Sequence, residues 1–300
     1  MIIPTRWYAG GKGLDSFRDA MLNDIRIKEL HDCLRPEEIF PYTNNRGGVC
    51  YFLWDQSYDN IANLTKVVTH DYNNESRTVN RSLKTRDLDI FIRDSQSITI
   101  LNKVISDSKT DNLSHHISAA KAFGFRTFFI KDKKFRSTKT GLKEPVLCYG
   151  RAGKIGFVEF SDITSHIDWV NLWKVYVPES NNIGTELSDD NQNSFVGGPY
   201  TVCTETYLVV GAELHLTELS ASNLVLYLRT KFARYLHSLP KISQHGTKKT
   251  YRFVPLQDFT TSSDIDWSQS IDNIDEQLFG KYGLTNDEKQ HIRTSIKEMA

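Results

Sequence analysis

The fold is decided by the opening stretch of the chain, Met1-Ile-Ile-Pro-Thr-Arg-Trp-Tyr-Ala-Gly-Gly-Lys-Gly-Leu14. Its first apolar residues predict a strand, and Tyr8–Leu14 predicts a glycine-rich turn that leads into a short helix at Asp15–Asn23. Two further apolar runs, Ile27–Leu30 and Val49–Trp54, predict strands. This pattern is typical of a strand–helix–strand unit in a largely parallel sheet, which requires cover on both faces.

The predicted first strand has no upstream neighbours in the sequence. We therefore expect this half-sheet to be completed by another chain, or the chain to be a part of something longer. A polar break at Asp55–Asn60 follows the last of the opening strands. The fold class predicted from these patterns is an α/β stub followed by an α+β domain with C-terminal helices.

The rest of the chain consists mostly of predicted strands with irregular links, and it ends in helices. Pro240 ends the longest predicted helix, and Thr285 with Glu288 forms a capping box for the last one. The predicted helices are Ile98–Ile105, capped by Ser95, then Ala221–Leu239 and Asn286–Met299. The predicted strands are Leu64–Tyr72, Leu88–Arg93, Phe123–Ile130, a hairpin of Pro145–Tyr149 and Ile155–Phe160, Leu172–Val177 and Tyr200–Val210.

Charge is balanced overall but unevenly distributed. The chain has 37 Lys and Arg residues and 37 Asp and Glu residues. Between Lys121 and Lys154 there are ten basic residues and two acidic ones, whereas from Asp258 to the end there are nine acidic residues and four basic ones. Such asymmetry indicates a nucleic acid or another anionic partner, and the alternative is a solvated lysine-rich loop.

Several other classes of protein are disfavoured. The four cysteines are scattered without a C-x-x-C pair, which fits small buried side chains in a reducing compartment and predicts no zinc site. The histidines do not show metal-ligand spacing, so we expect no metal. The chain has no signal-peptide pattern and no apolar run long enough to span a bilayer. We expect a cytoplasmic protein without a membrane partner.

The glycine-rich turn at Gly10–Gly13 does not meet the requirements of a phosphate loop. That motif is G-x-x-x-x-G-K-[ST], and here Lys12 is followed by Gly13, with no glycine at the required upstream position. The dinucleotide pattern G-x-G-x-x-G is also absent. ATP binding is therefore rejected, and the turn is interpreted as a flexible link between strand and helix.

The basic segment is the stronger candidate site. Phe123–Phe129 places aromatic residues between cations, and Arg126 is expected on a strand that could present it to a base edge. Lysines and arginines on neighbouring loops neutralise phosphates. A second cluster follows the long helix and includes Lys241 as part of a phosphate-facing ridge. The candidate DNA-binding residues are Lys121, Arg126, Lys131, Lys133, Lys134, Arg136, Lys139, Arg151, Lys154, Lys248, Lys249 and Arg252.

Several long stretches resemble the end of the catalytic domain and the following part of adenine-specific DNA methyltransferases from bacterial type II restriction–modification systems. The resemblance runs over nearly the whole chain. The stretches that carry it are Ile2–Arg18, Gly47–Asp55, Gly124–Phe128, Cys203–Gly211 and Ile242–Phe259.

The resemblance implies a division of the chain into three parts. Residues 1–58 would be the last strands of a methyltransferase fold, including its final antiparallel hairpin. Residues 59–218 would form the target-recognition domain, and residues 219–300 a helical region. Such enzymes flip the target adenine out of the duplex, and Phe40 matches the position of the family's base-stacking aromatic. The alternative for Phe40 is a core phenylalanine in a loop.

The sequence departs from the family in one important respect. Neither Asn-Pro-Pro-Tyr nor Asp-Pro-Pro-Tyr occurs in the 300 residues. We therefore expect the chain to lack the parts that bind S-adenosylmethionine and transfer the methyl group, and to have no catalytic residues of its own.

The expected function is recognition of double-stranded DNA as part of an adenine-N6 methyltransferase. Two alternatives are a non-catalytic DNA-specificity subunit and one half of a split enzyme that is active only with a partner chain. Neither the recognised sequence nor a fused nuclease is predicted.

Overall fold

The computed structural model describes residues 1–42, 47–58, 60–70, 75–105, 111–184, 190 and 192–299. Within these residues the strands form three sheets. None of the described helices is long and apolar enough to cross a membrane. The strands are β1 Ile2–Pro4, β2 Ile27–Cys33, β3 Val49–Trp54, β4 Thr65–His70, β5 Ser76–Arg81, β6 Pro145–Tyr149, β7 Ile155–Glu159, β8 Lys174–Pro178, β9 Phe195–Gly197, β10 Thr201–Cys203 and β11 Tyr207–Val210. The α-helices are α1 Asp15–Asn23, α2 Gln96–Val104, α3 Glu218–Arg229, α4 Lys231–Ser238, α5 Ile271–Lys281 and α6 Asn286–Ser295.

The N-terminal sheet has the strand order β1-β3-β2-β4-β5. Strand β3 lies between β1 and β2 and pairs antiparallel with both. Only β2 and β4 pair in parallel, and β4 pairs antiparallel with β5. The prediction of a largely parallel sheet is therefore wrong. That prediction rested on a strand–helix–strand pattern. Such a pattern does not decide whether strands that follow later in the chain join the sheet parallel or antiparallel.

One face of this sheet is buried and the other is partly open. Trp7, Leu30 and Cys50 form the buried side with Leu22 of α1 and Phe91. Alternation along β2 explains this, because successive side chains in a strand point to opposite faces. The helix α1 begins and ends where the sequence predicts it.

The N-terminal sheet continues past residue 58, which is the predicted domain boundary. Strands β4 and β5 lie beyond that boundary and still join the same sheet as β1–β3. The expected strand Leu88–Arg93 is an irregular segment with bends, and its buried Phe91 packs against Tyr8 at 4.6 Å between ring centroids. The polar edge strand β5 was missed because five of its six residues are exposed and it has no apolar alternation.

The central region contains two three-stranded sheets, ordered β10-β6-β7 and β11-β8-β9. The predicted hairpin of β6 and β7 is confirmed, with Leu147 opposite Phe157 in antiparallel register. The predicted single strand Tyr200–Val210 is wrong, because β10 and β11 belong to different sheets. The turn at Thr204–Thr206 separates them, and Tyr207 N donates to Thr204 O at 3.1 Å.

The aromatic segment Phe123–Ile130 does not form the predicted strand. It forms turns followed by the short 3-10 helix η4, Thr127–Lys131. Phe123 and Phe125 are buried against the β6–β10 sheet, while Phe128 remains exposed. The apolar and aromatic residues of this segment therefore indicate that it is buried, and they do not indicate a strand.

The predicted helix Ala221–Leu239 is divided into α3 and α4 at Thr230. This residue has extended ψ of 149°, and its hydroxyl accepts a hydrogen bond from Ala233 N, so it caps α4. The capping box of Thr285 and Glu288 at the start of α6 is confirmed. At α2 the predicted cap Ser95 makes no side-chain cap bond; Asp94 accepts from Ser97 N at 3.2 Å instead.

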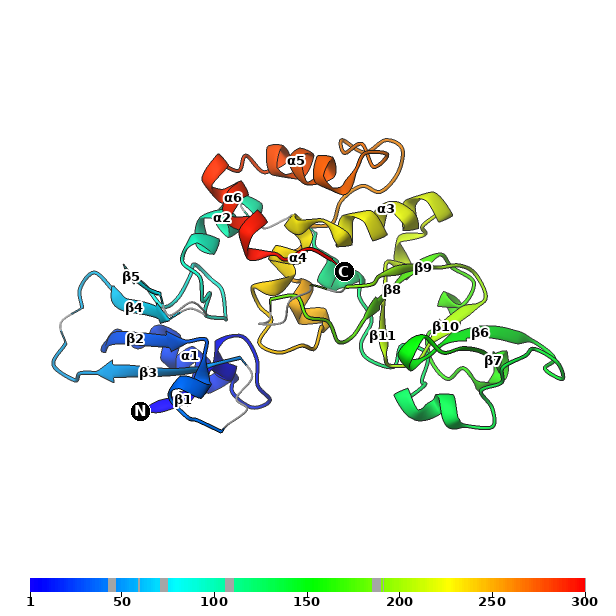
Figure 1. Cartoon of the computed structure of the whole chain (residues 1–300), viewed down its shortest axis with the longest axis horizontal. Helices are drawn as coiled ribbons and strands as arrows, with labels where there is room; N and C mark the ends of the chain where they lie inside the picture. Colours follow the sequence, from blue (N-terminus) through cyan, green and yellow to red (C-terminus); the bar gives the residue numbers. More distant parts are fainter. Residues whose placement is uncertain are drawn as a thin grey trace.

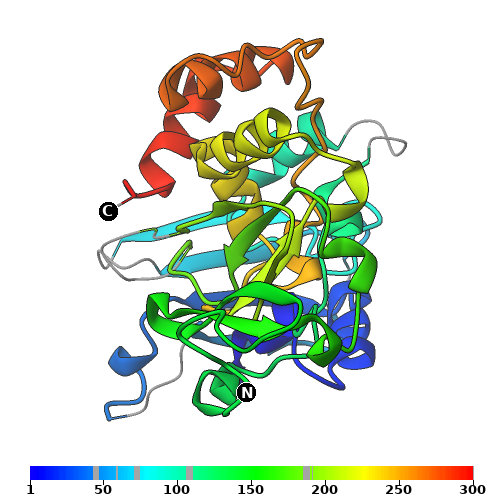
Figure 2. The same ribbon diagram turned by 90° about the vertical axis from the view of Figure 1, so that its right-hand side faces the viewer.

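The helices and the sheets occupy different sides of the molecule. Figure 1 shows α3, α5 and α6 along one side, with the N-terminal sheet and the β6–β7 hairpin at opposite ends below them. The view turned by 90° in Figure 2 again shows the C-terminal helices above the strands. The largest apolar cluster lies between these layers and joins α2, α3, α4, α5 and α6 to β8 and β11.

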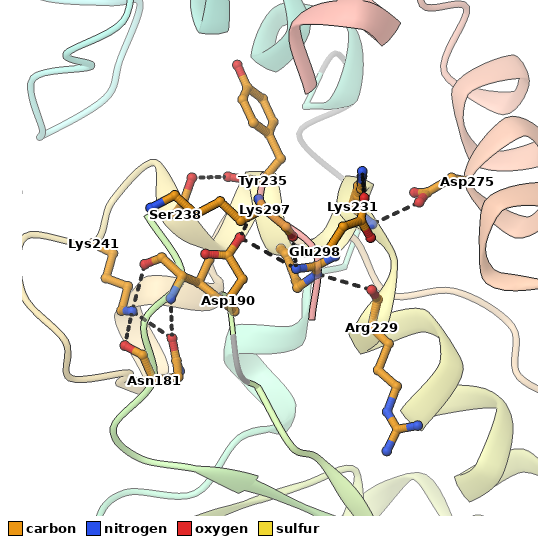
Figure 3. Close-up of polar contacts among 12 residues, drawn as sticks. Asn181, Asp190, Arg229, Lys231, Tyr235, Ser238, Lys241, Asp275, Lys297 and Glu298 are labelled. Carbon is orange, nitrogen blue, oxygen red and sulfur yellow. Dashed lines mark hydrogen bonds and ion pairs between the residues drawn. The ribbon is translucent and has the colours of Figure 1, made fainter. Parts of the chain in front are cut away.

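Buried polar contacts fix the C-terminal segment to the middle of the chain (Figure 3). Asp190 accepts from the Lys297 backbone at 3.0 Å and contacts Arg234 Nη1 at 3.5 Å, and burial raises the Asp190 pKa. Asp275 accepts from the backbone amides of Lys231 and Phe232 at 2.9 and 2.8 Å, which joins α5 to the start of α4. Burial raises the Asp275 pKa to about 6.

Candidate nucleic-acid interface

Two glycines allow the basic segment to lie directly on the β6–β7 hairpin. A Cβ atom at Gly150 would stand 2.3 Å from Ile130, and one at Gly156 would stand 2.5 Å from the ring of Phe135. Arg136 exchanges two backbone hydrogen bonds with Phe157, at 2.9 and 2.7 Å. The segment that carries the lysines is therefore fixed to the hairpin by packing and by backbone pairing.

Besides Lys134, this arrangement places six of the twelve predicted cations on the β6–β7 hairpin or on the segment that packs against it. Within the described residues, these side chains are exposed and form no ion pair. We call them the hairpin surface: Lys131, Lys133, Arg136, Lys139, Arg151 and Lys154. Because Ile130 packs on Gly150, the end of η4 lies beside the turn that carries Arg151 and Lys154. Lys121 is half-buried with φ of 59° and lies in the turn before η4.

Three predicted site residues are paired with acids. Lys134 Nζ contacts Asp162 at 2.7 Å, and Arg252 contacts Asp89 at 2.6 Å. Arg126 Nη1 contacts Glu205 at 3.5 Å and precedes η4, so its predicted place on a strand is wrong. These cations are less available to a phosphate than those of the hairpin surface.

The second basic cluster is only partly a surface. Lys248 and Lys249 are exposed on the 3-10 helix η9, Lys248–Tyr251. Lys241, expected on the same ridge, points inward and donates to Asn181 O, Asn181 Oδ1 and Ile183 O at 2.8, 2.6 and 2.8 Å. Burial lowers the Lys241 pKa to about 7. The predicted ridge therefore does not include this residue.

Two hollows lie near the basic residues and the glycine-rich turn. The first measures about 400 Å³ and is lined by Thr127, Arg151, Glu179 and Glu205 among others. The second measures about 250 Å³ and is lined by Arg6, Gly11 and the segment 242–245. An ion pair links the two linings, because Glu179 of the first lies 3.0 Å from Nδ1 of His245 of the second.

Sequence reasoning missed the acids of the first hollow. Glu205 and Glu179 lie far from the basic segment in the sequence. Glu205 follows β10, which pairs with β6, and Glu179 follows β8, which pairs with β11. Glu205 lies in Cys203–Gly211, a stretch that carries the family resemblance. This was the one feature of the sequence that could have pointed to Glu205 as a site residue.

Phe40 lies in the long connection between β2 and β3 and is 38% exposed. The end of this connection is fixed by Arg93, which donates to Gly47 O at 2.7 Å and forms an ion pair with buried Asp32 at 2.7 Å. Gly48 has φ of 90°, and a Cβ there would stand 2.4 Å from Cys33 O. The backbone amide of Phe40 donates to Pro36 O at 2.8 Å.

The acidic C-terminal residues are largely engaged within the fold. Glu288 contacts Lys103 at 2.6 Å, Asp264 contacts Lys281 at 2.8 Å, and Glu276 contacts Lys289 at 3.3 Å. Figure 1 shows α5 and α6 on the side away from the β6–β7 hairpin. The uneven charge of the sequence is therefore also separated in space.

Comparison with known proteins gives a limited relationship. No family model matches the chain. A segment of 59 residues is 32% identical to an uncharacterized adenine-specific methylase of Mycoplasma pneumoniae, strain ATCC 29342 / M129 / Subtype 1, and it covers 19% of this chain and 14% of that protein. This match supports a weak relation to adenine-specific methylases.

A solved structure, the type IIG restriction endonuclease BpuSI, aligns with 98% of this chain and 45% of its own length, with a TM-score of 0.37 and 10% identity. The chain thus spans less than half of that protein.

Proposed function

We propose that this chain binds double-stranded DNA as the recognition part of an adenine-N6 DNA methyltransferase of the restriction–modification type. The observation that carries the proposal is the hairpin surface, whose cations are exposed and form no ion pair among the described residues. DNA phosphates supply the complementary charge, and most contacts that position a protein on a duplex go to the backbone.

The placement of charge supports this proposal better than the total charge does. Lysines and arginines lie on the hairpin and on η9, whereas Glu276 of α5 and Glu288 of α6 form ion pairs elsewhere. A protein of zero net charge can still attract an anion when one face carries the positive potential. A duplex on the hairpin surface would then lie close to the first hollow, which Arg151 lines.

Phe40 is the candidate for stacking on a flipped adenine. It is partly exposed, and its backbone amide donates to Pro36 O at 2.8 Å. An aromatic ring held in this way gives a flipped base a surface to stack on.

S-adenosylmethionine does not fit the hollow beside the glycine-rich turn. The hollow beside the glycine-rich turn is lined by Arg6, Gly11 and residues 242–245, without a carboxylate to hold a ribose hydroxyl. The 300 residues also contain no Asn-Pro-Pro-Tyr or Asp-Pro-Pro-Tyr. The proposal therefore assigns DNA recognition to this chain and methyl transfer to residues outside it.

Two forms of the proposal differ in whether a second chain is needed. In the first, a partner chain carries the cofactor and catalytic residues and restores methyl transfer. In the second, the chain is a non-catalytic specificity protein. Incubation of the chain with duplex DNA and labelled S-adenosylmethionine tests the shared expectation, and methyl transfer by the chain alone would contradict both forms.

Duplex binding is tested by replacing Lys131, Lys133 and Lys154 with alanine. We expect weaker binding to a random-sequence duplex in fluorescence anisotropy, because each side chain would contribute a phosphate contact. The matched control replaces three cations of α5 and α6, Lys281, Lys289 and Arg293, and should bind as the unmodified chain does. Equal losses in the two variants would contradict the assignment of the hairpin surface.

A further inference from the structure

The first hollow contains a carboxylate that a simple phosphate-binding surface does not explain. Glu205 lies in the turn between β10 and β11, and Arg151 lies on the hairpin turn. Both line one hollow of about 400 Å³, together with Thr127 and Ser180. An acid at this place repels phosphate, so a ligand that donates hydrogen bonds would suit this hollow better than a phosphate.

Glu205 is held in one orientation. Its backbone amide donates to Phe125 O at 2.9 Å. One carboxylate oxygen accepts from Thr127 N at 3.0 Å and from Thr127 Oγ1 at 3.2 Å, and the other lies 3.5 Å from Arg126 Nη1. The side chain is 22% exposed, so it is fixed and still reachable. Ionised carboxylates accept through about four lone-pair positions, which leaves capacity for a ligand.

Arg151 supplies the opposite chemistry in the same hollow. It is exposed and forms no ion pair within the described residues. In the major groove, carboxylates accept from the amino group of cytosine, and arginine donates to O6 and N7 of guanine. A C·G pair offers both groups side by side, whereas an A·T pair offers no guanine acceptors.

We propose that Glu205 and Arg151 read one C·G base pair, with Glu205 accepting from cytosine N4 and Arg151 donating to guanine O6 and N7. This inference rests on the proposed function, because it requires a duplex on the hairpin surface. It goes further by naming the two side chains that select sequence and the base pair they select. The hairpin lysines would position the duplex, and these two residues would provide direct readout.

The test is selection of bound duplexes from a randomised library by the full chain. We expect the unmodified chain to enrich a site with an essential C·G pair. Glu205→Gln should lower the preference for that pair by about tenfold, since one good contact contributes discrimination of this order. Glu144→Gln is the matched control, because Glu144 is an exposed acid of the same basic segment outside the hollow. It should leave the preference unchanged.

A second variant keeps the inference testable if Glu205→Gln fails to fold. Arg151→Met should lower the preference for the same pair, whereas Lys154→Met should lower affinity for all sequences alike. Enrichment of a site that both Glu205→Gln and Arg151→Met retain would overturn the base-reading inference and leave duplex binding intact. Binding without any enriched base pair would overturn it as well. Failure of the unmodified chain to bind any duplex would instead overturn the proposed function, and the inference with it.

Discussion

Replacement of Lys241 by methionine should remove a specific part of the pH dependence of stability. Lys241 Nζ donates to two oxygens of Asn181 and to Ile183 O, and it thereby ties residues 181–183 to the segment that lines the second hollow (Figure 3). Burial lowers the Lys241 pKa from 10.5 to about 7, although Asp190 and Glu179 oppose this shift. Methionine retains the apolar stem and cannot bind a proton.

The sign follows from the protons bound in each state. Between pH 7 and pH 10.5 the unfolded chain holds a proton on this amine and the folded chain does not, so the free energy of unfolding rises with pH. The rise is about 1.4 kcal/mol per pH unit. Below pH 7 both states are protonated and this contribution to the slope disappears. From pH 7 to 8.5 the deprotonation of Lys241 should add about 2 kcal/mol to the free energy of unfolding.

The window ends near pH 8.5 because the cysteines then act in the opposite direction. Burial raises the pKa of Cys148 to about 12 and that of Cys33 to about 11, so their ionisation favours the unfolded chain. Lys174 behaves like Lys241: it donates to Val170, Leu172 and Gly198 carbonyls, and burial lowers its pKa to about 7. Lys241→Met should therefore remove about half of the pH-dependent rise in the free energy of unfolding that the two lysines produce.

Urea denaturation at pH 7.0, 7.5, 8.0 and 8.5 measures this slope. The control is Lys139→Met, which alters an exposed lysine and should keep the slope of the unmodified chain. If Lys241→Met keeps the full slope, the lowered pKa of this buried amine is refuted. If Lys174→Met reduces the slope and Lys241→Met does not, the error is confined to the 181–183 contact.

Three further substitutions test the packing that supports the site. Gly156→Ala places a methyl group 2.5 Å from the ring of Phe135. Urea denaturation should show that the free energy of unfolding falls by at least about 1 kcal/mol, and anisotropy should show weaker duplex binding. Unchanged binding would mean that this packing does not position the cations. Gly280→Ala in α5 meets no atom within 4 Å and should stabilise the chain by up to about 1 kcal/mol, whereas a loss would contradict the helix there. Thr285→Ala removes the capping box of α6 and should cost about 1 kcal/mol; a variant as stable as the original would refute that cap.

Local signals predicted the elements that local physics decides. The helix Asp15–Asn23, the hairpin of β6 and β7 and the cap at Thr285 all follow from short patterns of apolar, turn and capping residues. The aromatic run Phe123–Ile130 was misread because its phenylalanines pack against a sheet without joining it. Thr230 ends one helix and caps the next, and a continuous apolar stripe conceals this break.

The candidate site divides in the same way. A run of basic residues predicted the hairpin surface, because charge density can be read directly from the sequence. The fixed carboxylate of Glu205 could not be predicted, since Thr127 reaches it across 78 residues of chain. The inward turn of Lys241 was equally hidden, because its carbonyl partners lie about 60 residues earlier. Long-range contacts therefore decided which cations face outward.

The most direct test of DNA recognition is the salt dependence of duplex binding by the unmodified chain and by the variant with alanine at Lys131, Lys133 and Lys154. If each of these side chains neutralises one phosphate, the slope of log K against log salt should fall in magnitude by about 2.7 in the variant. The variant lacking Lys281, Lys289 and Arg293 should keep the original slope. An unchanged slope in the first variant would show that the hairpin surface is solvated and does not contact DNA.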